Sequence, residues 1–132
     1  MNIGAAAQAS GLSAKMIRYY EQIGLLPAAI RRDSGYRDYD SRDVDTLRFV
    51  RQARALGFTL DTIRALLSLW QDGQRSSADV KALALAQVAE LDQRISDLTR
   101  MRDAVARLAH RCHGDQRPEC PILEELERGR LA

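Results

Sequence analysis

The stretch SGLSAKMIRYYEQIG, residues 10–24, decides the fold of this chain. Ser10-Gly11 ends a short helical pattern over residues 3–9, which Asn2 can cap at its start. Ser13 is a good N-cap for a second helix only a few residues later. Two short helices joined by a tight glycine-containing turn are typical of a helix-turn-helix, whose second helix commonly enters the major groove of DNA.

The second helix has two different faces. Its apolar side chains recur at helical spacing and are Met16, Tyr20 and Ile23. Lys15, Arg18 and Tyr19 lie on another face, so we expect them to be free to contact DNA. Gly24 stands at the usual terminating position of this helix.

Residues 31–39 predict a small β-hairpin wing. Asp33-Ser34-Gly35 consists of residues typical of a tight turn. The residues on either side of it can pair with each other as two short strands, and their Arg and Tyr side chains would project from the hairpin. Cations on a wing bind phosphates, which fixes the position of a protein on the duplex without reading its sequence. The basic residues that cluster in this half of the chain are Lys15, Arg18, Arg31, Arg32 and Arg37. On charge alone, a solvated basic face explains this cluster equally well.

Two further amphipathic helices complete the predicted core. One starts near Asp40 or Ser41 and ends at Gly57, and the other runs from Leu60, capped by Thr59, to Trp70. Their expected apolar positions are Val44, Leu47, Val50 and Leu56 in the first, and Ile63, Leu66, Leu67 and Trp70 in the second.

A much longer helix follows the break at Asp72-Gly73. From Ser76 or Ser77 to about Ala109 the sequence contains no Gly or Pro. Apolar positions in this stretch alternate by four and three residues, a heptad seam interrupted only by an arginine; its members are Ala84, Val88, Leu91, Ile95, Leu98, Arg102, Val105 and Ala109. We expect a coiled-coil dimer, antiparallel or parallel, to bury the seam, and packing within the same chain is the alternative. The predicted domains are 1–72, 73–110 and 111–132.

The chain has only two cysteines, Cys112 and Cys120, at the ends of a loop that contains Gly114 and Pro118. Two thiols brought together by such a loop can bind one soft metal ion. A disulfide and two inert buried side chains are the alternatives. Pro121 is well placed to begin a short final helix through Leu126, whose positive dipole end would favour a thiolate at Cys120.

Composition narrows the class of protein. The 132 residues have a formal net charge of +2, and the excess of positive charge lies in residues 1–70, with ten Lys and Arg against seven Asp and Glu. No apolar run is long enough to cross a bilayer and no secretory pattern is present, so we expect a cytoplasmic protein with reduced thiols. No catalytic grouping or phosphate-binding glycine motif points to an enzyme.

Several motifs resemble the MerR family of transcription regulators. IRYYEQIGL (17–25) and GYRDY (35–39) are similar to its DNA-binding domain, and three further runs are similar to the copper-efflux (CueR) type: RQARALGF (51–58), SADVK (77–81) and CHGDQRPECP (112–121). The resemblance implies a mainly α fold, with an N-terminal winged helix-turn-helix and a long dimerisation helix in an antiparallel coiled coil. It also implies a homodimer that binds promoter DNA and, on binding metal, bends and untwists it so that RNA polymerase engages the promoter.

The resemblance also implies site residues. Those matching the family's reading helix and wing are Lys15, Arg18, Tyr19, Arg31, Tyr36 and Arg37, with Arg54 added from the next helix, whereas Tyr20 and Tyr39 are expected to pack inside. Cys112 and Cys120 are the expected ligands of Cu(I), with Ag(I) or Au(I) as look-alikes. Family members that sense divalent ions have a cysteine at the position of Ser77, which we expect to lie near the loop of the other subunit.

Histidines keep a zinc alternative open. His110 and His113 flank Cys112, and with both cysteines they could supply four ligands. His113 also departs from the proline usual at this position in the copper group. A thiol redox sensor and a metal-buffering chaperone are the other functions that the same cysteines would suit.

Overall fold

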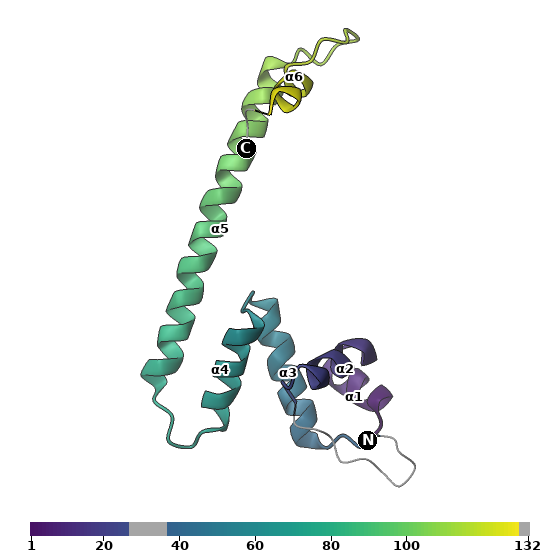
Figure 1. Cartoon of the computed structure of the whole chain (residues 1–132), viewed down its shortest axis with the longest axis vertical. Helices are drawn as coiled ribbons and strands as arrows, with labels where there is room; N and C mark the ends of the chain where they lie inside the picture. Colours follow the sequence, from purple (N-terminus) through teal and green to yellow (C-terminus); the bar gives the residue numbers. More distant parts are fainter. Residues whose placement is uncertain (27–36, 130–132) are drawn as a thin grey trace. The chain divides into compact units, whose positions relative to one another are not determined.

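The computed structural model describes residues 1–26 and 37–129, and these contain six α-helices (Figure 1). The helices are α1 (Ile3–Ser10), α2 (Ala14–Gln22), α3 (Ser41–Ala55), α4 (Leu60–Gln71), α5 (Ser77–Arg111) and α6 (Pro121–Arg128). They confirm the mainly α class. The chain divides into two compact units, Met1–Gln87 and Val88–Ala132, which are described separately below.

Local capping determines where the helices of the first unit begin. Asn2 accepts a hydrogen bond from the Ala5 amide at 2.8 Å, and Ser13 accepts one from the Met16 amide at 3.1 Å. Asp40 forms a capping box with Asp43, whose amide donates to it at 2.9 Å. The predicted starts of these helices are therefore confirmed.

The core of the first unit lies where α1 and α2 pack on each other and α1 and α4 pack on α3. Its buried side chains are Ala6, Ile17, Tyr20, Leu25, Leu26, Tyr39, Leu47, Val50, Ala53, Ile63 and Leu67. Tyr20 and Tyr39 are thus inside, as expected. Ile17, which the apolar spacing of α2 did not single out, is completely buried.

Two expected core residues are instead exposed. Leu56 is 63% exposed because it is the C-cap of α3, beyond the face that packs on α1. Trp70 is 41% exposed and stacks on Phe49 of α3 with ring centroids 4.6 Å apart. With Leu66 and Phe58 these residues line a shallow apolar hollow of about 450 Å³ between α3 and α4.

Most of the predicted wing lies outside the described residues. Of residues 31–39 only Arg37, Asp38 and Tyr39 are described, and Arg37 forms an isolated β-bridge. Tyr39 exchanges backbone hydrogen bonds with Met1, which brings this segment against the beginning of α1.

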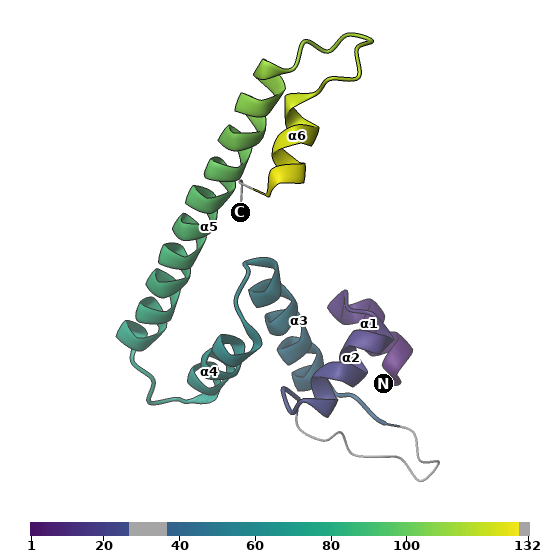
Figure 2. The same cartoon turned by 45° about the horizontal axis from the view of Figure 1, so that its top comes forward.

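The second unit consists of α5 from Val88 onward and α6, which folds back alongside the last turns of α5 (Figures 1 and 2). Leu108 is the buried residue of α5, only 3% exposed. The heptad seam is open in the single chain, since Ile95, Leu98 and Val105 are each 61% exposed. α6 continues to Arg128, two residues beyond the predicted end at Leu126. None of the helices described above is long and apolar enough to cross a membrane.

Candidate metal centre and nucleic-acid interface

The positions of both cysteines are determined by helix ends. Cys112 directly follows the last residue of α5, and its amide donates to the carbonyl of Ala109 at 3.2 Å. Cys120 is the N-cap of α6, with Pro121 in the first helical position. Both are free thiols of intermediate exposure, and their Sγ atoms lie 3.9 Å apart. The loop between the helices therefore brings the two sulfurs face to face.

The start of α6 favours the ionised form of one thiol. The backbone amides of Leu123 and, to a smaller extent, Ile122 lower the pKa of Cys120, and the neighbouring Cys112 acts in the same direction. Partial burial opposes them, and so does the charge of Glu124. A thiolate is the form that binds a soft metal ion, so the amides at the start of α6 act on Cys120 in the direction that metal binding needs.

Few other donors gather at the cysteines. Asp115 is engaged within the loop, where it accepts hydrogen bonds from the backbone amide of Arg117 at 2.9 Å and from its Nε at 2.7 Å. His110 and His113 are both exposed. Across residues 1–26 and 37–129, no group of three or more His, Cys, Asp or Glu side chains is placed to hold a metal ion. The four-ligand arrangement that zinc needs is not assembled in this part of the chain.

α2, which is predicted to read the DNA, presents the three predicted side chains to solvent. Lys15, Arg18 and Tyr19 of α2 are exposed, Tyr19 by 42%, whereas Ile17 and Tyr20 face the core. Ile23 is the C-cap of α2, and its carbonyl accepts a hydrogen bond from Arg64 of α4. α4 therefore contacts the C-terminal end of α2, the helix that is predicted to enter the DNA groove.

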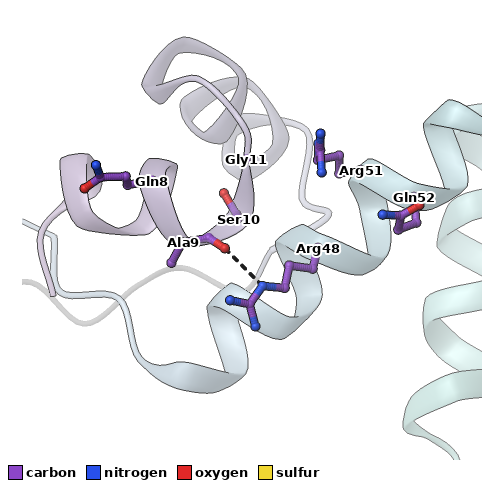
Figure 3. Close-up of a pocket in the computed structure, with 7 residues that line it drawn as sticks. All are labelled: Gln8, Ala9, Ser10, Gly11, Arg48, Arg51 and Gln52. Atoms are coloured by element: carbon purple, nitrogen blue, oxygen red, sulfur yellow. Dashed lines mark hydrogen bonds between the residues drawn. The ribbon is translucent and has the colours of Figure 1, made fainter.

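Two arginines of α3 support the turn before the reading helix (Figure 3). Arg48 Nε donates to the carbonyl of Ala9 at 3.0 Å, and the guanidinium of Arg51 covers Gly11. Together with Gln8, Ser10 and Gln52 they line a hollow of about 530 Å³. Sequence reasoning missed both residues; their spacing of three along α3 could have placed them on one face.

The remaining predicted DNA contacts differ in their surroundings. Arg54 is exposed and donates at 3.4 Å to the carbonyl of Phe58 in the turn between α3 and α4. Arg37 is partly buried and forms an ion pair with Glu21, a residue that the sequence did not single out. Arg31 and Tyr36 lie outside the described residues.

Comparisons with known proteins agree with this architecture. Residues 1–70 match the model of the MerR HTH family regulatory proteins, and residues 44–108 match the model described as MerR, DNA binding. The chain therefore belongs to the MerR family of helix-turn-helix regulators.

Individual relatives cover nearly the whole chain. The heavy metal-dependent transcription regulator 2 of Rhizobium meliloti (strain 1021) is 55% identical over 98% of this chain and 88% of its own length. The HTH-type transcriptional regulator CueR of Yersinia pestis is 46% identical over 96% of this chain and 91% of its own. The solved structure of the transcription regulator PbrR691 from Ralstonia metallidurans CH34 in complex with lead(II) is 32% identical with a TM-score of 0.83, and covers 96% of this chain and 98% of that one.

Proposed function

We propose that this protein is a metal-responsive transcriptional activator, in which Cys112 and Cys120 bind one Cu(I) ion per subunit. The observation that carries the proposal is the pair of sulfurs 3.9 Å apart at the junction of α5 and α6. Two metal–thiolate bonds of about 2.3 Å span at most about twice that length, so 3.9 Å lies within the reach of a single ion. The similarity to heavy metal-dependent regulators supports the same function.

Charge and ligand number favour a monovalent ion. Two thiolates satisfy a d10 ion such as Cu(I), Ag(I) or Au(I), whereas zinc generally takes four ligands. No third donor is placed beside the pair in the described part of the chain. The position that is cysteine in divalent-metal sensors of the family is Ser77 here, which removes a further thiolate.

In a homodimer, the start of α5 in one subunit would lie beside the metal loop of the other subunit. Ser77 begins α5 and Cys112 follows its end, and a helix of 35 residues is about 50 Å long. In an antiparallel pair of α5 helices, Ser77 of one chain would meet the cysteine loop of the other. The exposed seam on α5 supports this assembly because its leucine, isoleucine and valine side chains are 38% to 61% exposed in the single chain.

The helix-turn-helix would then act on promoter DNA in the cytoplasm. Each subunit uses residues 1–72 to bind DNA, 73–110 to dimerise and 111–132 to bind metal. The proposed DNA contacts are Lys15, Arg18, Tyr19, Arg31, Tyr36, Arg37 and Arg54. Metal binding changes the dimer so that it bends and untwists the promoter, which realigns it for RNA polymerase and activates efflux or detoxification genes.

The test separates metal sensing from DNA binding. We expect Cys112→Ser and Cys120→Ser each to abolish Cu(I)-dependent transcription in vitro, while gel-shift affinity for the promoter changes less than about twofold, because neither thiol is in the DNA-binding unit. His113→Ala, in the same loop, is the matched control and should keep Cu(I) induction. X-ray absorption of the Cu(I)-loaded protein should show two sulfur ligands and no nitrogen.

Other results would replace the proposal. Four mixed nitrogen and sulfur ligands would indicate a zinc site. Induction by oxidant with a Cys112–Cys120 disulfide in anaerobically purified protein, and no one-ion mass increase with Cu(I), would indicate a redox sensor. Loss of DNA binding in both cysteine variants would make the thiols structural.

A further inference from the structure

A buried carboxylate connects α2 to Arg37, near the end of the predicted wing. Glu21 lies in the last turn of α2, and its side chain is only 5% exposed. It forms an ion pair with Arg37, whose side chain is 27% exposed and precedes α3 by a few residues. The pair therefore joins two parts of the DNA-binding unit that are not consecutive in the sequence.

Tyr39, two residues after Arg37, is a further buried polar side chain of the same segment. The hydroxyl of Tyr39 is buried, and within the described residues neither it nor Glu21 Oε1 has a hydrogen-bond partner. Burial raises the pKa of Tyr39, the charges of Arg37 and Arg18 act in the opposite direction, and the charge of Asp43 adds to the rise. Buried polar atoms without hydrogen-bond partners raise the free energy of the folded state unless their side chains are held in a fixed arrangement.

The chemistry of the two partners determines what the ion pair does. A guanidinium has five N–H donors in a rigid fork. When a carboxylate accepts from one side of the fork, the N–H donors on the other side stay available. Removing one partner from a buried pair leaves an uncompensated charge, which is more costly than the loss of an exposed pair. Glu21 is therefore placed to set the orientation of Arg37, while the exposed part of Arg37 remains accessible to a phosphate.

We propose that Glu21 is a positioning residue for DNA binding, which orients Arg37 so that α2 and the Arg37 guanidinium meet the phosphate backbone together. Arg18, one turn earlier on the exposed face of α2, would contact the DNA next to it. The inference rests on the proposed function only in that Arg37 is one of the proposed phosphate contacts.

The experiment measures how the DNA affinity of the full chain depends on salt. Each phosphate contact contributes about 0.9 to the slope of log K against log salt. With a duplex that the wild type selects from a random library, we expect Glu21→Gln to lower affinity about tenfold and the slope by about one. This loss runs against the added positive charge of the variant, which by itself would favour DNA.

Asp45→Asn is the matched control. Asp45 is an exposed carboxylate of the same unit, 3.8 Å from Arg48. Its substitution changes the net charge by the same amount but does not touch Arg37, so affinity should stay equal or rise slightly, with the slope unchanged. A slope in Glu21→Gln equal to that of the wild type, with only thermal stability reduced, would make Glu21 purely structural and overturn the proposal.

Two further variants complete the test, and the first of them applies even if the Glu21→Gln protein does not fold. Arg37→Lys keeps the charge but not the fork, and we expect it to lose several-fold in affinity while remaining folded. Wild-type affinity in Arg37→Lys would contradict a role for orientation. If Glu21→Gln is folded, the double variant with Arg37→Ala should bind no more weakly than Arg37→Ala alone, and additive losses would also overturn the proposal. Failure of the wild type to bind any duplex would instead contradict the proposed function.

Discussion

At the turn between α1 and α2, Gly11 adopts a φ of 80°, and the guanidinium carbon of Arg51 lies 3.0 Å from where a Cβ would stand. A side chain there is strained by the left-handed backbone and must also displace Arg51. We expect Gly11→Ala to lower the free energy of unfolding by about 1–2 kcal/mol, measured by urea denaturation.

Gly73 provides the comparison for this residue. A Cβ at Gly73 would meet no atom within 4 Å, and its φ is not positive. Gly73→Ala should therefore change the free energy of unfolding by less than about 0.5 kcal/mol. Equal losses in the two variants would show that the turn at Gly11 has no special constraint.

At the scale of elements, Gln87 attaches the first turns of α5 to the end of α3. Its Nε2 donates at 2.9 Å to the carbonyl of Leu56, one of the helix-end carbonyls left without an intrahelical partner. We expect Gln87→Ala to speed hydrogen exchange of the amides in residues 77–87 by about fivefold, which corresponds to the loss of one hydrogen bond. Peptide-resolved mass spectrometry measures this directly.

A second glutamine on the same helix serves as a control for the effect of a Gln→Ala substitution on helix propensity. Gln93 donates to Asp97 on α5 itself, at 3.0 Å, and within residues 1–26 and 37–129 its side chain makes no hydrogen bond to another helix. Gln93→Ala should leave exchange over residues 77–87 unchanged. Faster exchange in both variants would mean that helix propensity, and not the bond to Leu56, protects this region.

At the scale of the whole molecule, the exposed seam of α5 accounts for the proposed dimer. Leu98 is 61% exposed in the single chain, and a charge there would have to be buried in a coiled coil. We expect Leu98→Lys to weaken dimerisation at least tenfold in analytical ultracentrifugation. Ser96→Lys adds the same charge outside the seam and should leave the dimer intact. A dimer that tolerates both substitutions would use another surface.

Helix capping and apolar periodicity explain which features of the fold could be predicted from the sequence. Helix starts followed from Asn2, Ser13, Asp40 and Thr59 because a capping side chain bonds an amide only a few residues ahead. Leu56 was wrongly placed in the core because periodicity does not show that the helix ends one residue earlier. The ion pair of Glu21 with Arg37 was missed since nothing in the local pattern distinguishes a buried carboxylate from an exposed one.

The order of the helices, the residues at which they begin and the exposed side chains Lys15, Arg18 and Tyr19 of α2 followed from the amino-acid sequence, because these features depend on neighbours within a turn or two. Three contacts came from the folded chain alone: the sulfurs 3.9 Å apart, the hydrogen bond from Arg64 to Ile23, 41 residues away, and the hydrogen bond from Gln87 to Leu56. Such contacts depend on which turns of distant helices pack together, and that is determined by the shape of the core.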